Sequence, residues 1–153
     1  LRAAIARHGV SPRQLVLELT EEHLLDPTGV VATTLNELAA IGVWIAVDDF
    51  GTGYSSLMHL RSLPLTHLKI DREFVTGVLE NDHDRVIVRA VTDLAHNLGL
   101  SVTAEGVESE AVADELRRLG CDYAQGYHWA RPMPLDELLA SDLIGRAQQS
   151  PIG

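Results

Sequence analysis

The sequence predicts an α/β protein in which helices cover a parallel β-sheet. Short apolar runs rich in β-branched residues alternate with segments of helical hydrophobic period along the 153 residues. Strands that are apolar almost throughout are typical of a parallel sheet covered by helices. These observations leave two architectures open, an open doubly wound sheet and a (β/α)8 barrel.

Each expected element can be placed along the chain, which begins with a helical segment at residues 1–9. The five expected strands are residues 15–19, 43–47, 66–70, 100–104 and 122–125. Helical segments between the strands end in a glycine, where a helix C-cap is expected. Three such segments are residues 30–42, 85–99 and 108–120.

Composition and charge exclude several classes of protein. With 46% hydrophobic residues the chain can bury one sizeable core, which excludes disorder. The formal net charge of −10 opposes binding to bulk nucleic acid or an anionic membrane, so an anionic ligand would need metal ions. The longest apolar stretch, residues 38–47, is shorter than the ~20 residues of a bilayer span. Because the single Cys121 cannot form an intrachain disulfide, we expect a cytoplasmic protein, with any membrane attachment of a parent protein outside this chain.

A polar side chain lies at the end of every expected strand. The carboxyl ends of parallel strands converge on one face, which carries the active site in barrels, so these side chains should surround one cavity. An acid after a strand can instead cap the next helix. That explanation is reasonable for any one of these residues, but it does not explain why all five strands end in a polar residue. The residues at these strand ends are Glu18, Asp48, Asp49, Lys69, Asp71, Glu105 and Gln125.

These carboxylates predict a site for divalent metal ions. Closely packed carboxylates raise one another's pKa unless a cation compensates, and oxygen ligands without Cys or paired His favour Mg²⁺, Mn²⁺ or Ca²⁺ over zinc. The adjacent Asp48 and Asp49 suit two ions about 3.5 to 4 Å apart, the arrangement that promotes in-line attack on a phosphate ester. Lys69 either orients the attacking hydroxide or forms an ion pair with Asp71.

The glycine turn in VDDFGTGYSSL, residues 47–57, allows a second interpretation. A strand followed by Gly51, Gly53 and a helix start partly matches a dinucleotide-binding turn, which would predict a nucleotide-dependent oxidoreductase. However, Ser56 replaces the third glycine, and two carboxylates lie where pyrophosphate would approach. A flexible glycine loop beside a metal pair accounts for the same residues better.

Five motifs occur in order along the chain, namely LELTE (17–21), DDFGTGYSSL (48–57), LKID (68–71), TAEGVE (103–108) and QGYHWARPMP (125–134). Together they resemble the EAL domain, the bacterial phosphodiesterase that linearises cyclic di-GMP. The resemblance implies a modified (β/α)8 barrel, of which this chain resembles the last two thirds. The family's namesake Glu-Ala-Leu strand and its strand with a metal-binding asparagine have no counterpart in the sequence.

The resemblance therefore implies an α/β fold that is a partial (β/α)8 TIM-like barrel of EAL type, lacking its N-terminal strands. Residues 1–145 would form the N-terminally truncated EAL domain, and residues 146–153 a polar C-terminal tail.

The resemblance further implies hydrolysis of cyclic di-GMP to linear pGpG with two Mg²⁺ or Mn²⁺ ions. Ca²⁺ would be inhibitory, because it supports binding but not turnover. Glu18 and Asp48 would bind the first metal, and Asp48 would bridge to a second ion that Asp49 also holds. Glu105 would bind near the second ion and its water, and Lys69 would contact the nucleophilic water, which makes Lys69 and Glu105 the catalytic candidates.

The remaining implied roles concern the substrate, the glycine loop and the partners. Asp71 and Gln125 would support metal and substrate binding. Glu21 would anchor the loop containing Gly51 and Gly53, which in the family couples dimerisation and metal binding to activity. The implied partners are cyclic di-GMP, a second copy in a homodimer, and an upstream sensor or cyclase domain in a parent chain. The alternative is a receptor that binds cyclic di-GMP without cleaving it, and the retained metal carboxylates argue against that alternative.

Overall fold

The computed structural model describes residues 1–20, 29–51 and 57–143, and in them five strands form one parallel sheet. The spatial order of the strands is their order in the sequence, β1-β2-β3-β4-β5, and each neighbouring pair is parallel. A doubly wound sheet reverses its strand order, whereas a barrel keeps it, so the fold is a partial α/β barrel. The five strands confirm the five predicted ones: β1 Val16–Thr20, β2 Trp44–Phe50, β3 His67–Ile70, β4 Ser101–Ala104 and β5 Tyr123–Ala124.

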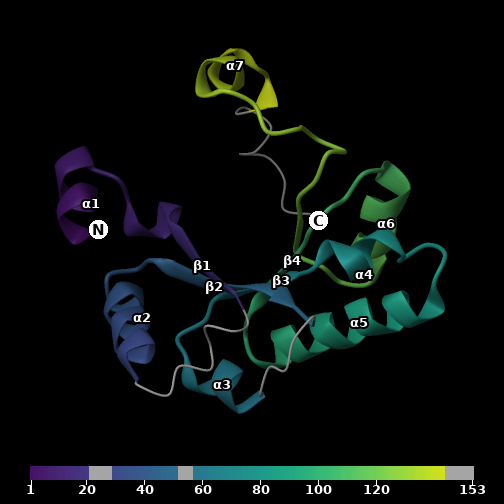
Figure 1. Cartoon of the computed structure of the whole chain (residues 1–153), viewed down its shortest axis with the longest axis horizontal. Coiled ribbons are helices and arrows are strands. Elements are labelled where there is room, and N and C mark those ends of the chain that lie inside the picture. Colours follow the sequence, from purple (N-terminus) through teal and green to yellow (C-terminus); the bar gives the residue numbers. More distant parts are fainter. Residues whose placement is uncertain (21–28, 52–56, 144–153) are drawn as a thin grey trace.

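Helices follow the strands and cover one side of the sheet. In Figure 1, helices α2, α3 and α5 lie along the same side of the strands, and α7 stands apart on the opposite side. None of the described helices is long and apolar enough to cross a bilayer. The helices are α1 Arg2–His8, α2 Val30–Ala40, α3 Leu57–Ser62, α4 Arg72–Thr76, α5 Asp82–Asn97, α6 Glu110–Arg118 and α7 Leu135–Ala140, with a 3₁₀ turn at Pro12–Gln14.

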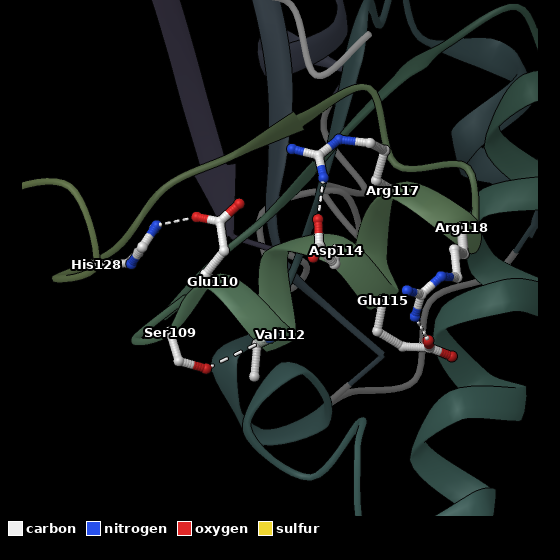
Figure 2. A network of polar contacts seen from close by, with 8 residues as sticks. All are labelled: Ser109, Glu110, Val112, Asp114, Glu115, Arg117, Arg118 and His128. Carbon is white, nitrogen blue, oxygen red and sulfur yellow. Dashed lines mark hydrogen bonds and ion pairs between the residues drawn. The ribbon is translucent and has the colours of Figure 1, made fainter.

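Local sequence signals explain where three of the helices begin. The side chain of Asp71 accepts a hydrogen bond from the N–H of Glu73 at 2.7 Å and caps α4. Asn81 caps α5 in the same way, and Ser109 Oγ accepts from the N–H of Val112 at the start of α6 (Figure 2). Such caps satisfy N–H groups that have no partner inside the helix.

The hydrophobic core lies between strands β2 to β4 and the helices that cover them. Leu68, Ile70 and Val102 on the strands are fully buried, as are Val88 of α5 and Leu116 of α6. By contrast, β1 alternates between exposed and half-buried residues, as befits a strand with one neighbour in the described sheet. The packed centre therefore holds the middle of the sheet rigidly, and the strand ends project from it.

Candidate metal centre

The centre of the site is Lys69 of β3, whose side chain is only 8% exposed. Its Nζ atom lies 2.8 Å from Glu18 Oε2 and 3.0 Å from Asp48 Oδ1, and it also contacts Glu105 Oε1. These three partners come from β1, β2 and the residue after β4, so four neighbouring segments meet at one ammonium group. The structure thus brings together residues that are up to 87 positions apart, as the strand-end pattern predicted.

A lysine suits this position better than an arginine would. Of the twelve basic Lys and Arg residues in the sequence, Lys69 is the sole lysine. An ammonium group has three N–H donors that point in different directions, which matches three separate carboxylates, whereas a planar guanidinium favours two parallel bonds to one partner. The presence of one lysine among eleven arginines is therefore a feature of the composition that points to Lys69.

The charges at this cluster do not balance, and the pKa values reflect that. Burial opposes the charged form of Lys69, but hydrogen bonds to Glu105, Glu18 and Asp48 outweigh this cost and raise the pKa of Lys69. Burial also raises the pKa of Glu105, although the neighbouring Lys69 lowers it. Burial and repulsion from Asp48 raise the pKa of Asp49. Three carboxylates contact the one ammonium group of Lys69, so negative charge exceeds positive charge in this cluster.

A break in the strand β2 brings two consecutive aspartates to the same place. Successive side chains of a regular strand point to opposite faces, which would separate Asp48 from Asp49. The register between β2 and β3 shifts between Val47 and Phe50, and Asp49 has a positive φ of 53°. As a result, carboxylate oxygens of Asp48, Asp49 and Glu105 all lie within 4.8 Å of one another, close enough to be ligands of one metal ion.

Asp71 and Gln125 occupy the two sides of this carboxylate group. Gln125 Nε2 donates to Glu105 Oε1 at 2.9 Å, so it orients that carboxylate. Asp71 caps α4, and it is one of the neighbours that raise the pKa of Asp49 after burial and Asp48. The alternative prediction, an ion pair between Lys69 and Asp71, is wrong for the described residues. The ion pairs of Lys69 are with Glu18, Asp48 and Glu105.

A cleft of about 1100 Å³ adjoins the carboxylate group. Arg131 places its guanidinium 4.9 Å from the ring centroid of Tyr127, within the range of a cation–π contact. Arg72, Tyr127 and Arg131 do not lie directly at a strand end, so the strand-end pattern does not predict them, although Tyr127 and Arg131 fall inside the QGYHWARPMP motif. The residues that line the cleft include Asp49, Asp71, Arg72, Glu108, Gln125, Tyr127 and Arg131.

The predicted loop anchor is described only in part. Glu21 and Gly53 lie outside the described residues, so their roles stay predictions, as does the tail at residues 146–153. Gly51 has a φ of +104°, and a Cβ atom there would lie 3.0 Å from Phe74 Cε2. A side chain at position 51 would therefore be strained by its backbone conformation and crowded by Phe74.

The fold and the site define a barrel-type α/β domain with an acidic, lysine-centred site at the carboxyl ends of its strands. The family profile described as "EAL domain" matches residues 1–132. The chain therefore belongs to the EAL domain family, and the resemblance noted in its motifs is confirmed.

Individual relatives agree with this assignment. The chain is 45% identical over 141 residues to the bifunctional diguanylate cyclase/cyclic di-GMP phosphodiesterase MucR of Pseudomonas aeruginosa, covering 92% of the chain and 21% of MucR. The chain thus spans about a fifth of that relative's length. A solved structure of the MucR phosphodiesterase in complex with cyclic di-GMP superposes with a TM-score of 0.83 at 44% identity, covering 90% of this chain and 56% of that one. The manganese and cyclic di-GMP complex of Klebsiella pneumoniae BlrP1 gives a TM-score of 0.78 at 31% identity, covering 85% and 33% of the two chains.

Proposed function

We propose that this chain forms the metal-binding part of a phosphodiesterase that hydrolyses cyclic di-GMP to linear pGpG. The observation that carries the proposal is the group of Asp48, Asp49 and Glu105 beside the buried ammonium of Lys69. The similar MucR structure is a cyclic di-GMP complex, and BlrP1 has been solved with cyclic di-GMP and either manganese or calcium. Their ligands support the choice of a cyclic dinucleotide and of divalent cations.

The chemistry of the donor set fits two Mg²⁺ or Mn²⁺ ions. The donors are carboxylates, which favour hard cations. Burial first, and repulsion from Asp48 second, raise the pKa of Asp49, and burial raises the pKa of Glu105, so a divalent cation beside these carboxylates would favour their charged forms. We assign Glu18 and Asp48 to one ion, and Asp48, Asp49 and Glu105 to the second. Bound ions would polarise phosphate oxygens and lower the pKa of a bound water.

The chain's own residues would position the reactants around these ions. Lys69 would keep a positive charge beside the attacking water, because the raised pKa leaves its amine protonated. Gln125 would hold the carboxylate of Glu105 in place through its hydrogen bond. Arg72 and Arg131 in the cleft would contact the phosphates of the dinucleotide. Hydrolysis would form a bond between the water oxygen and phosphorus and break the bond between phosphorus and one sugar oxygen. The water would lose one proton, and the leaving sugar oxygen would gain one.

Conversion of cyclic di-GMP to pGpG with Mg²⁺ or Mn²⁺ tests the proposal. The assay uses the complete product of the gene beside the 153-residue chain. We expect Lys69→Ala to lower kcat by about 100-fold or more while metal binding persists, because it removes charge next to the reacting atoms. Asp48→Asn should weaken metal binding itself. Arg89→Ala is the matched control, since its ion pair with Asp93 is exposed on α5, and it should leave turnover unchanged.

The same assay separates the enzyme from the receptor alternative. Binding of cyclic di-GMP in the presence of Ca²⁺, without cleavage in Mg²⁺ or Mn²⁺, would establish a receptor. Wild-type protein that neither binds nor cleaves the dinucleotide would contradict both readings.

A further inference from the structure

Two loops that follow neighbouring strands are joined by a ladder of backbone hydrogen bonds. The N–H of Gln125 donates to Ala104 O at 2.9 Å, and the N–H of Val107 donates to Gln125 O at 3.1 Å. The N–H of His128 then donates to Val107 O at 3.0 Å. The segment after β5 is therefore bound along its first residues to the segment between β4 and α6.

A side-chain contact lies at each end of this row of backbone hydrogen bonds. At the inner end, Gln125 Nε2 donates to Glu105 Oε1 at 2.9 Å, within the metal centre. At the outer end, His128 Nε2 lies 2.8 Å from Glu110 Oε2 in the first turn of α6. Figure 2 shows the His128 ring reaching across from its loop to the Glu110 carboxylate. The His128 side chain is 24% exposed, so it is partly enclosed, and the Trp129 ring lies edge-on to it at 4.8 Å between centroids.

The two loops are in direct backbone contact. A Cβ atom on Gly126 would lie 2.1 Å from Val107 O and 2.3 Å from Val107 N, so the two backbones touch directly. Both loops also contribute residues to the cleft lining, with Gly106 and Glu108 in one loop and Tyr127 and Arg131 in the other. A contact that holds the second loop in place therefore bears on where Tyr127 and Arg131 lie.

We propose that His128 is a positioning residue for the dinucleotide site, acting through its contact with Glu110. The contact holds the loop after β5 against α6, and so sets where Tyr127 and Arg131 stand relative to the metal centre. This inference rests on the proposed function, since the ligand whose binding it tunes is the cyclic dinucleotide. His128 lies outside the carboxylate group and contacts the site only through the loop that it holds.

A second histidine offers a matched control. His96 at the end of α5 makes the same kind of contact, with Nε2 2.9 Å from Asp122 Oδ2. That pair lies at the opposite ends of the strands, where Asp122 precedes β5. Removing either ring deletes one histidine–carboxylate contact, but only His128 borders the cleft loops.

The test compares His128→Ala, His128→Gln and His96→Ala in the complete gene product, with cyclic di-GMP and Mn²⁺. We expect His128→Ala to raise KM about threefold with kcat changed less than about twofold, the size of effect that one partly exposed pair allows. His128→Gln retains an N–H donor and should restore KM. His96→Ala should leave both parameters unchanged. An unchanged KM in His128→Ala, or an equal rise in His96→Ala, would overturn the proposal.

Amide hydrogen exchange gives a readout that does not depend on activity. In the 153-residue chain, His128→Ala should speed exchange of the amides at Val107 and Trp129 about threefold, whereas His96→Ala should not. If wild-type protein shows no turnover, the proposed function fails, while faster exchange at these amides still supports the positioning role. Unchanged exchange in His128→Ala would overturn the positioning role whatever the activity.

Discussion

At the amino end of the sheet, the side chains of Asp122 and Thr66 both have hydrogen-bond partners. Asp122 Oδ2 accepts from the N–H of Val102 at 2.7 Å and contacts His96 Nε2 at 2.9 Å. Thr66 Oγ1 both donates to Ile45 O and accepts from Ile45 N. At the carboxyl end, by contrast, Glu18, Asp48 and Glu105 share one ammonium group. The pKa values of Glu105 and of the neighbouring Asp49 are raised, first by burial.

This difference indicates that the two ends of one sheet serve different purposes. Satisfied hydrogen bonds at the amino end each contribute about 1 kcal/mol to the stability of the fold. Crowded carboxylates at the carboxyl end cost stability until a cation compensates them, which is common at functional sites. Neutralising an aspartate should therefore raise stability at the carboxyl end and lower it at the amino end, and three experiments test the contrast between the two ends.

The largest expected effect follows removal of the shared cation. Lys69→Met should lower the free energy of unfolding by about 3 kcal/mol, because it leaves Glu18, Asp48 and Glu105 without their compensating charge. Added Mn²⁺ should recover part of the loss by supplying positive charge at the same carboxylates. Urea unfolding with and without Mn²⁺ measures both changes.

Arg89→Met is the control for that experiment. Its partner Asp93 is more than half exposed, so its loss should cost less than about 0.5 kcal/mol. A loss of similar size in Lys69→Met and Arg89→Met would contradict the view that the carboxyl end depends on one buried cation.

A smaller effect of opposite sign is expected from two matched Asp→Asn substitutions. Asp49→Asn should raise the unfolding free energy by up to about 1 kcal/mol, because it removes repulsion and Asn tolerates positive φ. Its Mn²⁺ affinity should fall by about tenfold or more. Asp122→Asn should lower the unfolding free energy by about 1 kcal/mol and leave Mn²⁺ affinity unchanged.

Urea unfolding of these two variants measures the change in stability, and Mn²⁺ titration measures the change in metal affinity. If both variants lose stability to the same extent, the carboxyl end is not under electrostatic strain, and the contrast between the two ends fails.

The smallest expected effect is a pH dependence at the amino end. Burial lowers the pKa of His67 below its ordinary value of 6.5, although Asp122 opposes this. In the unfolded state His67 keeps its ordinary pKa, so as the pH drops through 6.5 the unfolded state takes up a proton before the folded state does. The unfolding free energy should therefore fall as the pH drops from about 7 to about 5. His67→Gln should flatten this decline by less than about 1 kcal/mol.

Urea midpoints of wild type and His67→Gln across that pH range give the measurement. The difference between the two proteins isolates His67 from other titrating groups. Parallel curves would show that the ring of His67, tilted by 31° against Trp44 with the centroids 4.9 Å apart, contributes nothing to the pH dependence.

Much of the fold could be predicted from the sequence because it depends on local patterns. Each of the five apolar runs became a strand, and the segments ending in Gly42, Gly99 and Gly120 became helices. The polar residue at each strand end could be placed at one face because parallel strands share a direction. The order of the strands could not be predicted from these patterns, which fit a doubly wound sheet as well as a barrel.

The sequence by itself determined which residues stand at the carboxyl ends of the strands, since periodicity and chain direction fix that much. The tertiary structure alone decided how those residues meet. Asp48 and Asp49 converge because the register of β2 shifts, and Lys69 contacts three carboxylates because β1 to β4 lie side by side. Likewise, His128 reaches Glu110 only because two distant loops pack backbone to backbone at Gly126. Contacts of this kind depend on the spatial order of strands and loops, and local sequence patterns do not encode that order.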